Sequence, residues 1–329
     1  MRAENKTSLT EFILTGLSED RKMQVLLFVV FLLMYSLTIV GNLLVIILVQ
    51  VSSSLHTPMY FFLTHLSSVD ICFITSTMPQ TLAHLLSGNG VISFTRCAVQ
   101  MYITTCLGCT ECILLGAMAY DRYLAICSPL AYASVMDRWR QLLLVSFSWA
   151  GGILLGVINV TCTICLPFCG TNRINHFFCE QPVVFKYTCA DARFTQPIIF
   201  VVSALILMGP LSVIIISYVL TLYSVFQMKS AAGRHRAFST CASHLMVVVL
   251  FYGALIFMYM RPWADTATEG DKQIAVFYII VTPLLNPVIY TLRNKNVHGA
   301  VRNVLQKWGM EQKRCVSGSL EPPKGVLFL

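Results

Sequence analysis

Charged residues are scarce in this sequence of 329 residues. Asp, Glu, Lys and Arg together make up 12% of the chain, whereas hydrophobic residues make up 56%, and the mean hydropathy is +0.71. A soluble globular domain carries about 25% charged residues. The composition therefore excludes an ordinary soluble protein and indicates a membrane protein.

The chain also lacks the short alternating segments that a membrane β-barrel would show. It has instead seven long segments with little or no charge, and each meets the requirement of about 20 residues for a spanning helix. They are 25–49, 58–86, 98–120, 141–169, 194–228, 237–260 and 273–292. The predicted fold is an all-α bundle of seven transmembrane helices over residues 25–292, with an N-terminal tail at 1–24 and a C-terminal tail at 293–329.

Motifs of several other protein classes are missing. The sequence has no nucleophile and base arrangement and no phosphate-binding loop, so an enzyme is not expected, and nothing in it indicates a nucleic-acid partner. A transporter is disfavoured by the odd number of helices and the lack of an internal repeat. No cleavable signal peptide is predicted, because residues 1–20 are polar, and the first helix is expected to direct insertion.

Cysteines and a glycosylation sequon indicate the orientation, because Lys and Arg are divided almost evenly between the two sides. Cys97, Cys169, Cys179 and Cys189 lie in or beside loops on the N-terminal side, where oxidising conditions would allow three disulfide pairings. A sequon begins at Asn5 on the same side. We therefore expect an extracellular N-terminus and a cytoplasmic C-terminus, with the basic side facing anionic lipid or an acidic partner.

Two carboxylates lie inside the predicted spans, Asp70 in the second and Glu111 in the third. A carboxylate in a membrane is costly unless it is protonated, paired or bound to a cation. A shared site would suit a hard cation such as Na⁺. Protonation of one or both groups is the alternative, and both interpretations stay open. No cofactor other than this allosteric Na⁺ is expected.

A polar stripe runs along the third predicted helix. Five whole turns of about 3.6 residues separate Thr104 from Arg122, so the two share a face roughly 27 Å apart. Glu111 falls on the same stripe. Asp121 directly precedes Arg122, so an acid and a base end an otherwise apolar segment.

Several motifs follow one another along the chain. They are Gly41-Asn42, Leu55–Tyr60, Met118–Leu130 (MAYDRYLAICSPL), Ser217-Tyr218, Arg236–Leu245 and Pro283–Tyr290. Together they resemble the vertebrate odorant (olfactory) receptors, a family of rhodopsin-like G-protein-coupled receptors, and the resemblance covers nearly the whole chain. It departs from the family at Ser128, where His is usual, and in the tail after Trp308.

The resemblance implies a plasma-membrane receptor that binds small, volatile, mostly apolar molecules and activates the stimulatory olfactory G protein, which raises cyclic AMP. A receptor of the same family for a metabolite outside the olfactory epithelium is the alternative. The resemblance also implies that Cys97 pairs with Cys179 and Cys169 with Cys189, so that the loop at 170–193 covers the bundle. Pairing of Cys97 with Cys189 stays open.

The ligand is expected in the outer half of the bundle. The stripe on the third helix selects Thr104 and Gly108, with Thr105 and Cys109 adjacent. Alignment with the family adds Val202, Ser203 and Ile206 on the fifth helix, Tyr252, Leu255, Ile256 and Tyr259 on the sixth, and Ile279 on the seventh. This lining is expected to have no ionisable group, so the expected ligand is neutral and gains about 0.8 kcal/mol per buried CH₂.

The resemblance also implies a signalling set at the cytoplasmic end. Its members are Asp121, Arg122, Tyr218, His244, Asn286, Pro287 and Tyr290. Asp121 is expected to restrain Arg122 in the inactive state, and movement of the sixth helix is expected to free Arg122 for Tyr218 and the G protein. The basic segment 229–236 is expected to be a loop, and a short amphipathic helix is expected after residue 293.

Overall fold

The structure is a computed structural model that describes residues 10–169, 171–189, 192–260, 269–291, 297–302 and 306. Its elements in chain order are β1 (Glu11–Leu14), α1 (Arg21–Val51), η1 (Ser53–Leu55), α2 (Pro58–Ser87), β2 (Val91–Ser93), α3 (Phe94–Cys127), α4 (Pro129–Val135), α5 (Arg138–Ile164), β3 (Arg173–Ile174), α6 (Gln181–Phe185), α7 (Ala192–Gln227), α8 (Ala231–Tyr259), α9 (Glu269–Val276), η2 (Phe277–Val281) and α10 (Thr282–Thr291). The element η2 is a turn of π-helix that joins α9 to α10.

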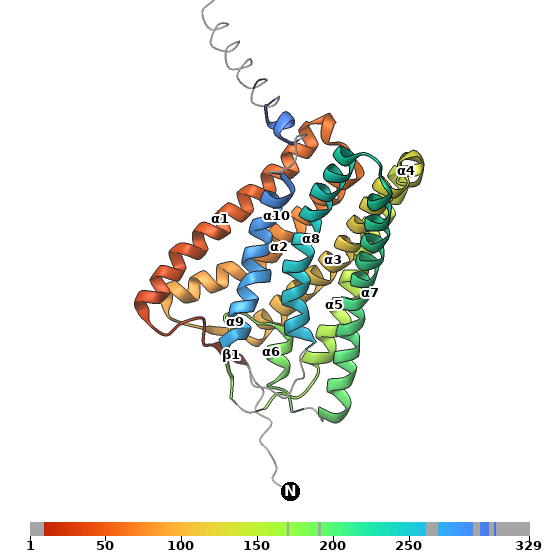
Figure 1. Cartoon of the computed structure of the whole chain (residues 1–329). Helices are drawn as coiled ribbons and strands as arrows, with labels where there is room; N and C mark the ends of the chain where they lie inside the picture. Colours follow the sequence, from red (N-terminus) through yellow and green to blue (C-terminus); the bar gives the residue numbers. More distant parts are fainter. Residues whose placement is uncertain are drawn as a thin grey trace, which may run out of the picture.

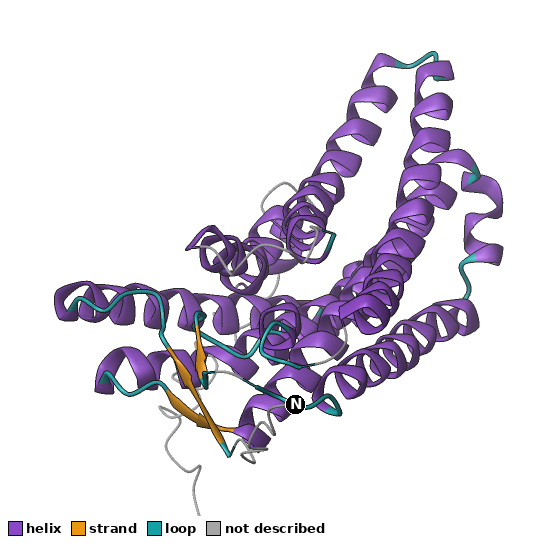
Figure 2. Cartoon of the chain, turned by 90° about the horizontal axis from the view of Figure 1, so that it is seen from below, coloured by secondary structure: helices purple, strands orange, loops and turns teal. Residues whose placement is uncertain are grey.

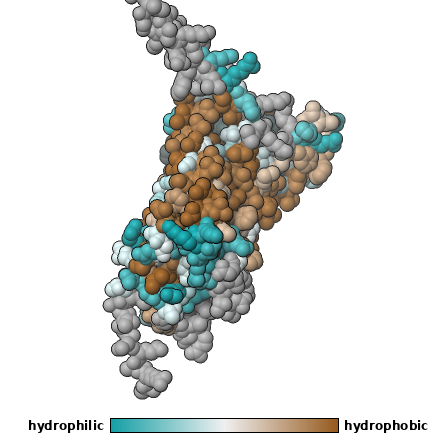
Figure 3. Space-filling view, turned by 90° about the vertical axis from the view of Figure 1, so that its left-hand side faces the viewer, coloured by the Kyte–Doolittle hydropathy of each residue, from teal (hydrophilic) through white to brown (hydrophobic). Residues whose placement is uncertain are grey.

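Seven helical stretches of the described chain are long and apolar enough to cross a membrane: α1, α2, α3, α5, α7, α8 and the continuous run α9–η2–α10. They form one bundle (Figure 1). Its surface carries a broad hydrophobic belt between two hydrophilic ends (Figure 3). Large apolar side chains lie on this surface, and Leu33, Leu205 and Val249 are 60%, 69% and 69% exposed. The predicted seven-helix fold is confirmed.

Two predicted boundaries were wrong. The fourth span ends at Ile164 and not at residue 169, because Pro167 disfavours the helical conformation in the residue before it. The segment 229–236, expected to be a loop, lies mostly in the first turns of α8. The Ser230 hydroxyl starts that helix by accepting a hydrogen bond from the backbone N–H three residues later.

Polar groups inside the bundle find partners on neighbouring helices. Asn42 of α1 donates to the backbone oxygen of Pro283 in α10 at 3.1 Å, which is the interhelical contact that a buried amide requires. Glycines bring α3 and α5 together, since Gly152 faces Thr110 and Gly156 faces Cys106. These contacts fix the helices around which the site is built.

A small sheet covers the end of the bundle at which α1 begins, which we call the N-terminal end (Figure 2). Its strand order is β2-β1-β3, with β1 antiparallel to β2 and parallel to β3. Phe12 and Leu14 of β1 are at most 1% exposed. The strand lies within residues 1–24, which were predicted to be an N-terminal tail, and it was not predicted.

Some sequence predictions fall on residues outside the described part. Asn5, with its sequon, and the tail after Trp308 are among them. Of the helix expected after residue 293, the structure describes 297–302, which is helical, with Val297 and Ala300 buried.

Candidate functional site

The segment 165–189 lies over the N-terminal end of the bundle, and we call it the lid. One disulfide joins Cys179 of the lid to Cys97 at the start of α3. A second, between Cys169 and Cys189, closes the lid on itself across a sequence separation of 20 residues. These are the two pairs that the family resemblance implied.

Hydrogen bonds attach the lid to two helices. The backbone N–H of Cys179 donates to the side-chain oxygen of Gln100 on α3 at 2.8 Å. The side chain of Gln181 donates to the Asn159 side-chain oxygen at 3.3 Å and to the Thr163 hydroxyl at 3.0 Å, both on α5. Glu180 lies between these two anchors and Phe178 directly precedes the first, so both residues are held over the bundle.

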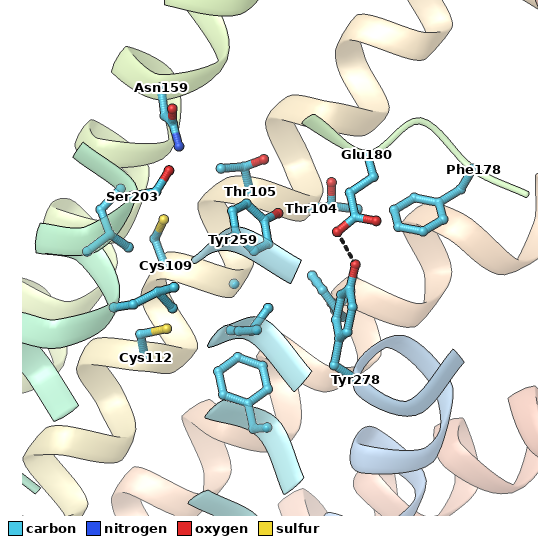
Figure 4. Close-up of a pocket in the computed structure, with 16 residues that line it drawn as sticks. Thr104, Thr105, Cys109, Cys112, Asn159, Phe178, Glu180, Ser203, Tyr259 and Tyr278 are labelled. Carbon is cyan, nitrogen blue, oxygen red and sulfur yellow. Dashed lines mark hydrogen bonds between the residues drawn. The ribbon is translucent and has the colours of Figure 1, made fainter. Parts of the chain in front are cut away.

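A cavity lies beneath the lid (Figure 4) and has about 550 Å³ of space not filled by atoms, counted out to its mouth. Most of its lining is apolar, with hydroxyl groups from α3, α7, α8 and η2. The lining residues are Phe73, Thr104, Thr105, Gly108, Cys109, Cys112, Asn159, Phe178, Glu180, Ser203, Ile206, Leu207, Phe251, Leu255, Tyr259 and Tyr278. This composition is typical of a small-molecule pocket with a few orienting polar groups.

Most of the predicted ligand residues line this cavity. They are Thr104, Thr105, Gly108, Cys109, Ser203, Ile206, Leu255 and Tyr259. The α3 residues succeed one another at helical spacing along one face, as the stripe argument requires. Placement of these side chains at one cavity is an observation about geometry, and their role in ligand binding stays a prediction.

Four predicted residues do not line the cavity: Val202, Tyr252, Ile256 and Ile279. On α8 the lining side chains follow the four-residue spacing of Phe251, Leu255 and Tyr259. Tyr252 and Ile256 each lie one position further along, about 100° around the helix. The Tyr252 hydroxyl instead donates to the backbone oxygen of Cys112 at 2.9 Å.

Val202 and Ile279, the other two predicted residues that do not line the cavity, also lie off the helix face that does. On α7 the cavity face is Ser203, Ile206 and Leu207, so Val202 lies off this face. Ile279 is fully buried in η2, while its neighbour Tyr278 lines the cavity. A π-helical turn is wider than an α-helical one, so it changes which residue faces inward.

The lining contains an ionisable group, Glu180, that was not predicted from the sequence. The expectation that the lining has none was wrong, because the lid places Glu180 at one end of the cavity with 2% of its surface exposed. Tyr278 donates a hydrogen bond to its carboxyl group. Burial nevertheless raises the pKa of Glu180 to about 8. The sequence could have indicated this residue. The implied disulfide of Cys179 to the start of α3 holds the next residue, Glu180, over the bundle.

The other missed lining residues are Phe73, Cys112, Asn159, Phe178, Leu207, Phe251 and Tyr278. Cys112 could have been found by extending the α3 face from Cys109 by three residues. Phe178 follows from the same disulfide as Glu180. Phe73 and Asn159 come from α2 and α5, and nothing in their local sequence marks them.

Deeper in the bundle, Asp70 and Glu111 are both buried and interact with each other electrostatically. The Asn286 side chain donates to both carboxylate oxygens of Asp70, at 2.9 and 3.2 Å. Both oxygens of Glu111 are buried without a hydrogen-bond partner. Unpartnered carboxylate oxygens beside a second carboxylate form a donor set that fits a small cation.

At the opposite end of α3, Asp121 accepts a hydrogen bond from the Tyr132 hydroxyl of α4 at 2.7 Å. Asp121 and Arg122 are not among the direct ion pairs found in the described residues, although the Arg122 charge acts electrostatically on Asp121. The expected restraint of Arg122 by Asp121 stays a prediction. Arg122 has a buried Nε without a partner. The hydrogen bond from Tyr132 uses Oδ1 of Asp121, and Oδ2 is buried without a hydrogen-bond partner.

Tyr218 and His244 connect α7 to α8 near this end. The Tyr218 hydroxyl lies 2.8 Å from Nδ1 of His244, and the two rings stack with centroids 5.6 Å apart. The Tyr290 ring lies 6.5 Å from the same histidine, and Pro287 packs beside Gly41 of α1. The predicted signalling residues are therefore distributed over four neighbouring helices of the bundle.

Comparison with known proteins identifies the family. A family model described as "Olfactory receptor" matches residues 31–308. The chain belongs to the olfactory receptor family. It is 47% identical to olfactory receptor 5F1 of Homo sapiens over 307 residues, which covers 93% of this chain and 98% of that protein. It is 48% identical to olfactory receptor 2D2 of Homo sapiens over 305 residues, covering 92% and 98%. It is 45% identical to olfactory receptor 5P52 of Mus musculus over 305 residues, covering 93% and 98%.

Membership of the olfactory receptor family makes the chain an odorant-sensing G-protein-coupled receptor and not an enzyme. With its seven spanning helices, it is a multi-pass protein of the plasma membrane. In this receptor one helix, α3, carries Thr104 at the cavity, Glu111 at mid-depth and Arg122 at the other end. The stripe predicted along this helix therefore joins the cavity to the signalling end.

Proposed function

We propose that this olfactory receptor binds small, neutral, mostly apolar odorants in the cavity beneath the lid and activates a stimulatory heterotrimeric G protein, which raises cyclic AMP. The observation that carries the proposal is the lining itself, in which aliphatic and aromatic side chains surround a few hydroxyl groups. Glu180 keeps its proton at neutral pH, because burial raises its pKa to about 8, so the cavity offers no fixed charge to an ionised ligand.

The proposed orientation places the lid outside the cell and Arg122 at the cytoplasmic face. Its support is that both disulfides, Cys97–Cys179 and Cys169–Cys189, lie at the end of the bundle that also carries the N-terminal strand. Disulfides persist in oxidising surroundings. The opposite end then meets the G protein, and ligand-favoured opening of α8 away from α7 would break the Tyr218–His244 contact.

Asp70 and Glu111 carry a second part of the proposal, in which they hold an allosteric Na⁺. The two unpartnered oxygens of Glu111 support it, because a bound cation would satisfy both. Asp70 and Glu111 would hold the ion, which would supply positive charge to balance the two carboxylates. Asn286 fixes the position of Asp70 through two hydrogen bonds.

The test is a cyclic AMP reporter in cells that express the receptor, screened against a panel of odorants and small metabolites. We expect agonists among neutral, mostly apolar compounds. Arg122→Ala should abolish the response to those agonists while leaving surface expression intact. Arg140→Ala is the matched control, since Arg140 is an exposed arginine near the same end. Full signalling by Arg122→Ala, or no cyclic AMP response to any compound, would contradict the proposal.

A further inference from the structure

The polar groups around Glu180, at the lid end of the cavity, are occupied by one another. The carboxyl group of Glu180 accepts hydrogen bonds from the side chains of Tyr278 and Tyr259. Its Oε2 atom lies 3.5 Å from Nε2 of His176 in the lid. A ligand that brought a polar head group to this end would compete with hydrogen bonds that already exist. The lid end is therefore better suited to the hydrocarbon part of a ligand.

The other end of the cavity holds a hydroxyl group without a partner. Ser203 of α7 lines the cavity and is 2% exposed, and its Oγ makes no hydrogen bond. Figure 4 shows Ser203 on the side of the cavity opposite Glu180. A buried hydroxyl without a partner costs free energy, and a bound molecule that supplies a partner removes this cost.

Ser203 differs in this respect from other hydroxyl groups of the bundle. The hydroxyls of Thr104, Ser148 and Thr221 each donate to the backbone oxygen four residues earlier in the same helix, at 2.8, 2.8 and 2.7 Å. Such a bond satisfies a hydroxyl inside a helix without any neighbour. The Ser203 hydroxyl does not make it, so its proton is free to be donated into the cavity.

Asn159 of α5 supplies a second donor at the same end, and the lid fixes its orientation. The Thr163 hydroxyl donates to the backbone oxygen of Asn159 at 3.3 Å, so it must accept from the Gln181 amide nitrogen, 3.0 Å away. The same nitrogen donates to the side-chain oxygen of Asn159 at 3.3 Å. Asn159 therefore turns its oxygen toward the lid and its NH₂ group toward Ser203, as Figure 4 shows.

Two donors at one end of the cavity suit an oxygen atom with two lone pairs and no hydrogen. The carbonyl oxygen of an aldehyde or a ketone is such an atom, and it can accept from Ser203 and Asn159 together. A ligand hydroxyl can also accept from both, but its own hydrogen then finds no acceptor in this pair. The Asn159 oxygen already accepts from Gln181, and the contact between the ligand and Ser203 can carry only one hydrogen.

The remainder of the cavity determines what the body of the ligand must be. Leu207, Phe251 and Leu255 offer it apolar surface, and Gly108 leaves room beside α3. A hydrocarbon chain attached to the carbonyl group can lie against these residues and extend toward the lid end.

We propose that this cavity binds aldehydes and ketones, whose carbonyl oxygen accepts hydrogen bonds from the Ser203 hydroxyl and the Asn159 amide while the hydrocarbon chain extends toward the lid. The inference rests on the proposed function, because it names the ligand class of the same cavity. Alcohols of the same skeleton should bind more weakly, and alkanes should gain nothing from Ser203.

The first test uses straight-chain methyl ketones of six to ten carbons, the secondary alcohols of the same skeletons, and the alkanes in which CH₂ replaces the carbonyl group. Cyclic AMP is measured in cells that express the unaltered receptor. At the best chain length the ketone should be about tenfold more potent than the alcohol, because the alcohol leaves one hydrogen without an acceptor. Alcohols as potent as their ketones would overturn the inference, and this ranking requires no variant.

The second test measures binding through thermal stabilisation of the purified receptor. In Ser203→Ala the apparent affinity of the ketone should fall about tenfold, whereas that of the alkane should not change, because alanine removes only the donor. Ser212→Ala is the matched control, since Ser212 is an exposed serine of the same helix whose hydroxyl donates to the backbone oxygen of Gly209. An unchanged ketone affinity in Ser203→Ala, or an equal loss for ketone and alkane, would contradict the inference.

The two measurements also separate this inference from the proposed function. Stabilisation that favours the ketone and is weakened by Ser203→Ala, obtained without any cyclic AMP response, would support the inference and refute the signalling proposal. Cyclic AMP responses together with stabilisation that ignores the head group would support signalling and refute the inference.

Discussion

Replacing Gly152 by alanine should force α3 and α5 apart. A Cβ atom at position 152 would lie 2.1 Å from the Thr110 hydroxyl oxygen and 2.5 Å from the Thr110 backbone nitrogen, about 1 Å short of ordinary contact. The backbone nitrogen cannot rotate away, so the helices must separate. Gly156 repeats this contact one turn later, where a Cβ would lie 2.7 Å from the Cα of Cys106.

The expected cost is that of overpacking, typically 1–3 kcal/mol, even though alanine favours a helix by about 1 kcal/mol more than glycine does. Gly253→Ala is the matched control, because a Cβ at this position in α8 meets nothing within 4 Å. We expect the melting temperature of the purified receptor to fall for Gly152→Ala and to hold or rise for Gly253→Ala. If both variants melt like the unaltered receptor, the close approach of α3 and α5 is not as described.

Two further predictions concern buried carboxyl groups. Glu180 has a pKa of about 8 in the folded receptor against an ordinary 4.5, so folding retains its proton and stability falls as pH rises between these values. Burial lowers the pKa of His176 from 6.5 to about 3, so this group makes the folded state more stable as pH rises from 3 to 6.5. Above pH 6.5 it no longer changes the pH dependence of stability. The melting temperature should therefore decline between pH 6.5 and 8, and a scan of Glu180→Gln that declines equally would contradict this. Replacing Na⁺ by choline should lower the melting temperature of the unaltered receptor and leave that of Glu111→Gln unchanged; a Glu111→Gln variant with the same sodium dependence would exclude the proposed cation site.

The helices could be predicted from the sequence because each segment that crosses lipid must satisfy its own backbone hydrogen bonds. A long apolar run is helical whatever its neighbours are. The helical repeat also placed Thr104 and Gly108 at the cavity, since α3 is a regular helix along its whole length. Predictions that needed only local geometry therefore succeeded.

Predictions that depended on how elements meet were less accurate. To predict that Tyr278 and not Ile279 faces the cavity, one must know of the π-helical turn η2. No residue pattern in the segment predicts this turn. Glu180 reaches the cavity through the disulfide of its neighbour Cys179, and Asp121 meets a tyrosine from another helix, Tyr132. Such contacts depend on tertiary structure, which one segment of sequence does not contain.

The N-terminal strand was missed for a related reason. Only Phe12 and Leu14 alternate with more exposed residues in β1, and two positions are too few to distinguish a strand from a polar tail. The strand exists because β2 and β3 flank it on both sides. Its partners come from two different loops.

Filling the cavity tests most directly whether odorants act there. Gly108 lines the cavity, and a Cβ at this position would have only Phe73 near it, at 4.0 Å, so Gly108→Leu places a side chain where the ligand should lie. Gly209→Leu is the control, because Gly209 is exposed and a Cβ there meets nothing within 4 Å. Agonist-driven cyclic AMP should be lost in Gly108→Leu and normal in Gly209→Leu, with equal surface expression and basal signalling. An agonist response of Gly108→Leu equal to that of the unaltered receptor would show that the ligand binds elsewhere.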